Sequence, residues 1–219
     1  MMKISKKQTS TIIVITYFVA AFVYAYIRYA VYGNAVFATD ANFIINKAFA
    51  ATAVLSVFSA YMISSLAKTG NNFARKNSSY KRYFGLSGFY FICLHVFFGF
   101  RIIKPEHHPQ FFGTNDELAL RGEIIIIIGV ISLILFMFPA ISSMKDVMKK
   151  LGKSRWSVFQ RIGYIAFLMV MIHATMVGYH SWISPSTWYG GMPPITLICV
   201  TLIFLAISFR LYILLKFRK

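Results

Sequence analysis

The sequence predicts an all-α membrane protein, a polytopic bundle of about six transmembrane helices with both termini on the cytoplasmic side. Three observations support this fold class. Hydrophobic residues make up 58% of the 219 residues and charged residues only 13%, which is too little charge for the surface of a water-soluble domain. Six apolar stretches are long enough to cross a bilayer. Basic residues are concentrated in alternate connections between these stretches.

Each predicted helix is an apolar stretch of roughly the 20 residues that a membrane-spanning helix needs. In chain order, the stretches cover about residues 11–32, 43–67, 83–103, 122–144, 157–180 and 194–215. The connections are short, and none contains the glycine-rich strand-to-helix turn of a dinucleotide-binding domain. We therefore expect one transmembrane domain over residues 1–219 that does not itself bind a nicotinamide dinucleotide.

The first stretch has a second interpretation. It follows the basic segment Met1–Lys7 and precedes Val36–Ala38, a pattern that also fits a signal peptide with its cleavage site. The apolar core of a signal peptide is ordinarily 7–15 residues long, which is shorter than residues 11–32. Retaining the stretch also keeps the alternation of charge consistent, so we treat it as a transmembrane helix.

The net charge of +17 is explained by topology rather than by binding to nucleic acid. Basic residues cluster in the alternate segments 3–7, 68–82, 145–155 and 216–219. Five of the six acidic residues lie in or beside the other connections: Asp40, Glu106, Asp116, Glu117 and Glu123. Because basic connections stay on the cytoplasmic side, both termini are expected there, in what we take to be a bacterial inner membrane.

Two of the five histidines lie well inside predicted helices. His95 is 13 residues after Arg82 and His173 is 12 residues after Arg161, and both helices run outward from the cytoplasmic side. At 1.5 Å per residue, the imidazoles would lie ~19.5 and ~18 Å along their helices, at nearly one depth. A single histidine in a membrane could be a packing residue. Two that face each other at one depth are suited to the axial ligation of a haem b iron, on the outer side of the midplane.

Two segments that contain these histidines resemble a known family. Residues Arg82–His95 (RYFGLSGFYFICLH) and Arg155–Tyr164 (RWSVFQRIGY), followed by Ile172 and His173, are similar to motifs of the ferric-reductase-like transmembrane domain family. Within it, the likeness is closest to the haem-binding membrane subunits of bacterial periplasmic methionine-sulfoxide reductase systems. The resemblance implies a six-helix haem protein that passes electrons across the membrane.

The sequence departs from that family at the inner ligand positions. The resemblance implies a histidine thirteen residues before His173 and, in two-haem members, another fourteen residues before His95, but Gln160 and Lys81 occupy these positions. We therefore expect a single haem, held by the outer pair. Gln160 could contact a flavin or quinone at an inner site, and a packing or capping role is the alternative.

Other polar residues near the outer side have alternative interpretations. Arg101 could pair with a haem propionate or extend toward the lipid headgroups. Lys47, like Arg28 and Arg210, lies near the end of a predicted helix and is expected to extend toward the headgroups. His107, His108 and His180 are ligand types that could bind iron, copper or zinc at the outer face, or they could be polar loop residues.

The sequence therefore predicts a membrane electron-transfer subunit. Its donor would be a cytoplasmic flavoprotein or the quinone pool, and its acceptor a periplasmic oxidoreductase or a ferric or cupric ion. The alternative is a haem-free membrane scaffold or transporter that retains the fold. Reduction of oxygen to superoxide, as oxidase relatives perform, is less well supported because the chain has neither an inner histidine pair nor a dehydrogenase domain.

Overall fold

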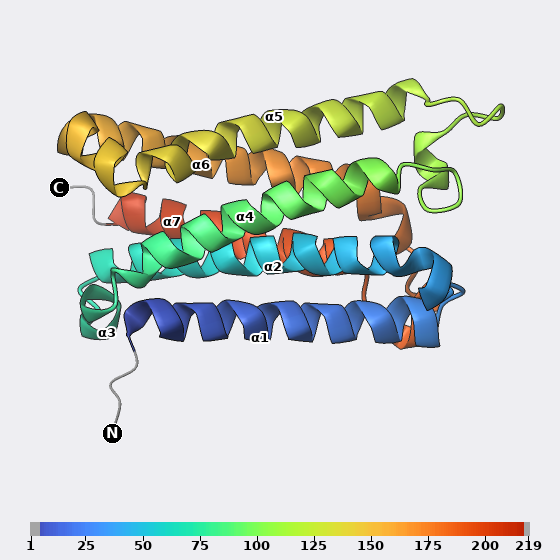
Figure 1. Cartoon of the computed structure of the whole chain (residues 1–219), viewed down its shortest axis with the longest axis horizontal. Coiled ribbons are helices and arrows are strands. Elements are labelled where there is room, and N and C mark those ends of the chain that lie inside the picture. Colours follow the sequence, from blue (N-terminus) through green and yellow to red (C-terminus); the bar gives the residue numbers. More distant parts are fainter. Residues whose placement is uncertain (1–4, 217–219) are drawn as a thin grey trace.

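A computed structural model of the chain describes residues 5–216 and contains a bundle of long helices (Figure 1). Six helices in this part of the chain are long and apolar enough to cross a membrane, and no β-strand occurs among the described residues. The predicted all-α fold class and the number of transmembrane helices are thus confirmed. Helix α1 begins, and helix α7 ends, at the same end of the bundle (Figure 1). We call this the inner end and the opposite one the outer end, following the charge-based prediction of topology.

The first half of the chain forms three of the long helices. Helix α1 covers Lys6–Tyr26 and continues as a π-helical turn, η1, over Ile27–Val31. It begins with a capping box, in which Ser5 and Gln8 each accept a hydrogen bond from the other's backbone N–H. Helix α2 covers Phe37–Lys68, and α4 covers Tyr80–Arg101. The short helix α3 (Asn72–Lys76) lies in the connection between them.

The second half forms the other three long helices, and short 3₁₀ turns occur in the two connections at the outer end. Helix α5 covers Leu120–Ser142, α6 covers Lys145–Trp182 and α7 covers Ile195–Lys216. The turn η2 (Pro109–Phe111) precedes α5, and the turns η3 (Pro185–Thr187) and η4 (Tyr189–Gly191) precede α7.

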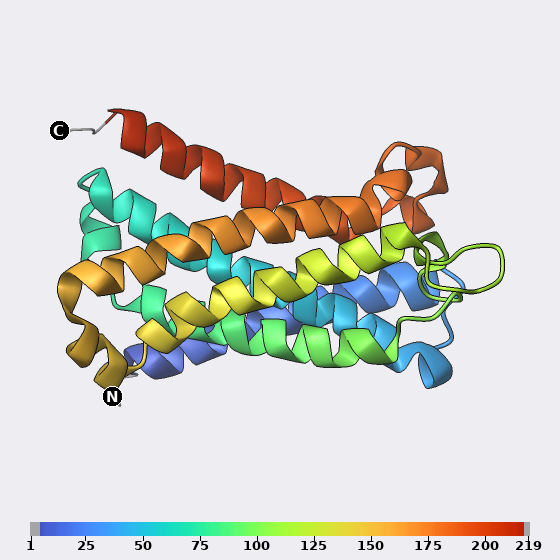
Figure 2. The same ribbon diagram turned by 90° about the horizontal axis from the view of Figure 1, so that it is seen from above.

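The fourth connection differs from the prediction. Residues 145–156, expected as a loop before the helix at 157–180, are mostly helical and belong to α6. Gly152 interrupts this helix with φ 68° and ψ 168°, a backbone conformation that glycine adopts without steric cost. The chain therefore turns sharply at the inner end, as the start of α6 in Figure 2 shows. The prediction was wrong here because it followed hydropathy, and a polar helix has no apolar stretch to detect.

Much of the apolar surface of these helices faces outward. Ile127 is 55% exposed, Phe204 is 58% exposed and Leu205 is 51% exposed. Exposed apolar side chains along whole helices are unfavourable in water but suit contact with lipid, where the helix satisfies its own backbone hydrogen bonds. This distribution supports an integral membrane protein.

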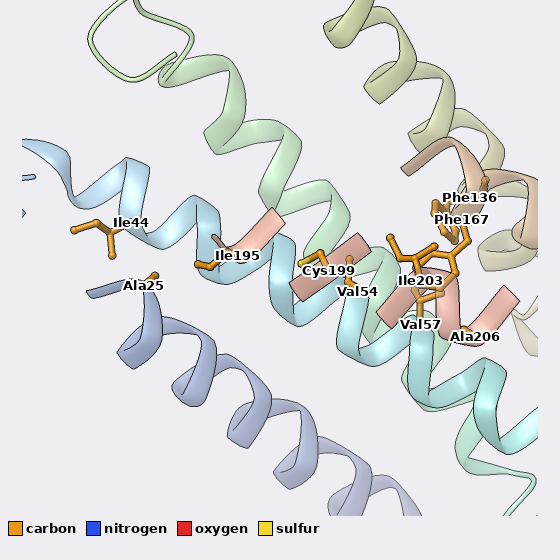
Figure 3. Packing of buried hydrophobic residues seen from close by; sticks show 11 residues of the cluster. Ala25, Ile44, Val54, Val57, Phe136, Phe167, Ile195, Cys199, Ile203 and Ala206 are labelled. Atoms are coloured by element: carbon orange, nitrogen blue, oxygen red, sulfur yellow. The ribbon is translucent and has the colours of Figure 1, made fainter. Parts of the chain in front are cut away.

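The core includes buried residues of every long helix except α4, whose partly buried Phe89 and Ile92 pack against it. Figure 3 shows it running from Ala25 of α1 through α2 and α7 to Phe136 of α5 and Phe167 of α6. Helix α4 packs mainly against α2, whereas it touches α5 only lightly and has almost no direct contact with α6. At the α2 contact, a Cβ on Gly88 would lie 2.7 Å from Val57 Cγ2, so the absent side chain permits this close approach. The side of α4 that faces α5 and α6 therefore takes little part in helix–helix packing.

Candidate functional site

A cavity occupies the space between α4 and the helices α2, α5, α6 and α7. Its volume is about 190 Å³, more than ten times the ~10–15 Å³ that holds one water molecule. Its lining is almost entirely apolar and includes small residues such as Ala53, Gly99 and Gly129. Both predicted ligands, His95 of α4 and His173 of α6, line it. The structure thus brings together the two histidines that the sequence singled out.

His95 is held in place by α2. Its Nδ1 lies 2.9 Å from Asn46 Oδ1, and an amide oxygen can only accept, so Nδ1 is the donor in this hydrogen bond. Asn46 itself is 3% exposed. Gly99, one turn after His95, has Asn46 Nδ2 at 3.9 Å from the position of a Cβ. This is an ordinary van der Waals distance, so the Asn46 amide packs directly against this face of α4.

His173 is held in place by α5. Its Nδ1 lies 2.9 Å from the carbonyl oxygen of Ile125 and must donate to it. A Cβ on Gly129, one turn further along α5, would lie 3.1 Å from His173 Cε1 and 3.2 Å from its Nδ1. Because Gly129 has no side chain, the imidazole can reach a helix carbonyl that a larger residue would cover.

The two hydrogen bonds fix the same tautomer in both rings. With the proton on Nδ1, the lone pair of each imidazole is on Nε2. Neither Nε2 has a hydrogen-bond partner among residues 5–216, and both rings are only half-buried because they expose surface that lines the cavity. A metal-ligating histidine ordinarily donates its other ring nitrogen to a carbonyl or amide oxygen in this way. The donor set therefore fits two axial ligands.

The number of ligands distinguishes a haem from a bare metal ion. Within the described part of the chain, no group of three or more His, Cys, Asp and Glu side chains is arranged to hold a metal ion. Bare zinc and similar ions take three or four protein ligands. A haem iron instead receives four nitrogens from its porphyrin and needs only axial ligands from the protein. Two imidazoles in an apolar cavity thus fit a haem better than an isolated metal ion.

Lys47 also lines this cavity, which differs from its predicted position among the headgroups. Its Nζ lies 4.7 Å from the centroid of the Phe43 ring. His108, in the outer connection, also lines the cavity. It is 7% exposed, and its ring stacks on the ring of Phe111 with 4.8 Å between the centroids. Burial, and after it the Lys47 ammonium, lower the pKa of His108 to about 2, so this imidazole is neutral. Lys47 is therefore the cation of the cavity.

Arg101, the residue predicted as a propionate partner, does not line the cavity. It is exposed at the outer end of α4, and its guanidinium carbon lies 4.4 Å from the centroid of the Phe97 ring. Phe97 is itself 53% exposed. Arg101 thus packs on the outward face of α4, as expected for a side chain that extends toward the headgroups.

The three outer histidines do not form one ligand set. His107 Nε2 is 3.8 Å from Asp40 Oδ1, and its ring stacks on Phe43. His108 lines the cavity, as described above. His180 is exposed and has its Nε2 2.6 Å from Arg121 Nη1, a donor. The described residues thus place the three in different surroundings, and of the three only His108 lines the cavity.

Gln160 caps the end of a neighbouring helix. Its Nε2 lies 3.1 Å from the carbonyl oxygen of Pro139, 2.9 Å from Ser142 Oγ and 3.1 Å from Ser143 Oγ. These acceptors belong to the last turn of α5 and the residue after it, and the Pro139 carbonyl also accepts a hydrogen bond from the backbone N–H of Ser143. Gln160 does not line the cavity. Of the two predicted roles, the structure contains the capping contact.

Aromatic rings fill the bundle between Gln160 and the cavity. Tyr61 of α2 stacks on Tyr164 of α6 at 4.2 Å, and Tyr61 contacts the edge of Phe167 at 5.4 Å. Phe167 meets Phe136 at 6.3 Å, and both phenylalanines line the inner limit of the cavity. Gly163 allows this packing, since a Cβ there would lie 2.5 Å from Tyr61 Oη. The cavity is thus closed toward the inner end.

Three residues of the site were missed by sequence reasoning: Asn46, Lys47 and Gly129. Their signals were present but ambiguous, because an asparagine and a lysine one turn or more inside an apolar stretch, or a glycine within a run of isoleucines, also occur without function. Neither a family model nor a curated protein matches the sequence, so the site is interpreted from its own geometry.

Proposed function

We propose that this protein is a membrane electron-transfer subunit that holds one haem b between His95 and His173. The observation that carries the proposal is the matched pair of imidazoles. Each donates its Nδ1 proton to a fixed oxygen, of Asn46 or Ile125, and each presents a free Nε2 to the same apolar cavity. This arrangement supplies two neutral ligands from helices that otherwise barely touch.

A haem with two imidazole ligands supplies one-electron transfer and has no open coordination position for oxygen or a substrate. The protein contributes the geometry. The hydrogen bonds to Asn46 and Ile125 prevent rotation of the imidazoles and raise the basicity of their Nε2 atoms. The surrounding isoleucine, valine and phenylalanine side chains exclude water.

The position of the cavity supports delivery of electrons on the outer side. Its lining includes His108 and Phe111 of the outer connection and Ile195 at the start of α7. Phe136 and Phe167 close it on the inner side. We propose a bacterial inner-membrane location, a cytoplasmic flavoprotein or quinol as donor, and an acceptor on the outer face, either a periplasmic oxidoreductase or a ferric or cupric ion. Membership of the ferric-reductase-like family is part of the same proposal.

The test is the haem spectrum of the purified protein. We expect the reduced-minus-oxidised difference bands of a low-spin haem b in the wild type, and their loss in His95→Ala and in His173→Ala. His180→Ala is the matched control, since His180 is exposed and bound to Arg121, and it should retain the bands. Circular dichroism checks that each variant keeps its helices.

Two results would contradict the proposal. If both variants kept the wild-type spectrum, His95 and His173 would not be the ligands. If the folded wild type stayed colourless after haem was supplied, the haem-free scaffold or transporter would be the better description.

A further inference from the structure

The ammonium of Lys47 lies in the cavity without an acidic partner. Among the described residues, the carboxylate of Asp40 lies 3.8 Å from His107 Nε2, and Lys47 has neither an acidic partner nor a hydrogen bond. Its described contact is with the ring of Phe43, at 4.7 Å. A charged group in apolar surroundings is costly unless an opposite charge compensates it. The cavity is therefore suited to a ligand that brings a negative charge.

The backbone of Lys47 lies close to the level of the His95 imidazole. It follows Asn46 directly, and Asn46 bonds His95. The side chain of Lys47 extends toward the outer end of α2, because its ammonium lies 4.7 Å from the ring centroid of Phe43, one turn earlier in that helix, and, second to burial, lowers the pKa of His108 in the outer connection. The charge is thus on the outer side of His95, beside His108.

We propose that Lys47 forms a carboxylate-binding subsite of the cavity and pairs with a propionate of the haem held by His95 and His173. This inference rests on the proposed function. The rival cation, Arg101, has its guanidinium over Phe97 on the outward face of α4 and does not line the cavity. The neutral His108 adds hydrogen-bonding capacity at the same place without adding charge.

The subsite has two consequences. It orients the haem with its carboxylates toward the outer side, because the cation lies on that side of the imidazoles. It also places a positive charge near the iron, which disfavours the ferric form relative to the ferrous form. Removal of this charge should therefore lower the midpoint potential of the haem.

The experiment compares two porphyrins in the full-length protein in lipid nanodiscs. One is iron protoporphyrin IX, and the other is its dimethyl ester, which has no carboxylates. The variants are wild type, Lys47→Met, Lys47→Arg and Arg101→Met. We expect the wild type to bind the free acid about tenfold more tightly than the ester, the magnitude of a charge-assisted hydrogen bond.

Lys47→Met should bind the two porphyrins almost equally and show a lower midpoint potential with the free acid, while its bands stay those of a low-spin, bis-imidazole haem. Lys47→Arg should restore most of the preference, and Arg101→Met should behave as the wild type. Removal of an unpaired charge from an apolar cavity should not lower the melting temperature of the haem-free protein, which separates this effect from misfolding.

The outcomes distinguish the subsite from the proposed function. A wild type that gives no low-spin spectrum with either porphyrin overturns both. A normal spectrum with the same tenfold preference and the same potential in Lys47→Met overturns only the subsite. If only Arg101→Met lost the preference for the free-acid porphyrin, the propionate would pair with Arg101 and not with Lys47.

Discussion

The outer and inner halves of the bundle are built from the same six helices but differ at their centre. In the outer half, Gly99 and Gly129 leave room beside His95 and His173, and a cavity of about 190 Å³ remains. In the inner half, the rings of Tyr61 and Tyr164 stack at 4.2 Å, and Gln160 is occupied with the end of α5. The outer half thus contains both the imidazoles and a cavity. The described residues of the inner half include no imidazole, and aromatic rings fill the corresponding space.

The region around Gln160 is therefore different from a second haem site that has lost only its histidine ligand. Protein interiors are close-packed, so a cofactor site needs both donors and a cavity of the right shape. The inner half has no imidazole at residues 81 and 160, and the space that Gly163 leaves is occupied by the ring of Tyr61. The comparison can be tested from both halves.

The largest effect is expected from Gly129→Leu. A Cβ at residue 129 already lies 3.1 Å from His173 Cε1, and the rest of a leucine side chain would displace the imidazole and cover the Ile125 carbonyl. We expect near-complete loss of bound haem, measured as haem per protein by the pyridine haemochrome method. Gly85→Leu on α4 is the control, because a Cβ there has no atom within 4 Å, and it should retain its haem. Full haem content in Gly129→Leu would argue against His173 as a ligand.

A smaller effect, on stability alone, is expected from Gln160→Leu. The change removes the amide donor shared by Pro139, Ser142 and Ser143, while the two serine hydroxyls still donate to the Pro139 carbonyl. We expect a loss of about 1 kcal/mol in the free energy of unfolding, seen as a lower melting temperature in detergent, with the haem spectrum unchanged.

Gln160→Glu provides the matched comparison, because a carboxylate has no proton to donate and its charge would lie close to the Pro139 carbonyl oxygen, which can only accept. It should be less stable than Gln160→Leu. A change of the haem spectrum in either variant would indicate that Gln160 contacts the cofactor after all.

The smallest effect is expected from the double variant Lys81→His and Gln160→His. It places imidazoles at the two inner positions that the family resemblance assigns to ligands, but Tyr61, Tyr164 and Phe167 still fill the space beside them. We expect one haem per chain, as in the wild type, measured by haem content and by a single step in a potentiometric titration. A second haem would show that the aromatic rings can move aside and that ligands alone decide the number of sites.

The candidate site could be predicted only in part. His95 and His173 were predicted together because two histidines at one depth in parallel helices are an unusual pattern, and the structure places both on one cavity. Lys47 was expected among the headgroups but lines the cavity, whereas Arg101, for which a propionate contact and extension toward the headgroups were both open, does not line it. Both lie near the outer ends of apolar stretches, so their distance along the helix does not separate them, whereas their direction around the helix axis does.

The sequence by itself determined the number of long helices and, through the alternation of charge, the predicted topology. These features depend on the length of apolar stretches and on charges near their ends, which are local properties of the chain. The helical segment before Gly152 was the exception, because a polar helix at the membrane surface carries no such signal.

Only the tertiary structure decided which side chains share the cavity. Each residue of a helix is rotated by about 100° from the one before it, so the packing of α4 on α2 and of α6 on α5 sets which residues face the space between them. That packing turns Asn46, Lys47 and Gly129 toward the two histidines and leaves Arg101 outside. The two candidate histidines could be identified from the local sequence, but the hydrogen bonds and the charge around them depend on contacts between residues far apart in the chain.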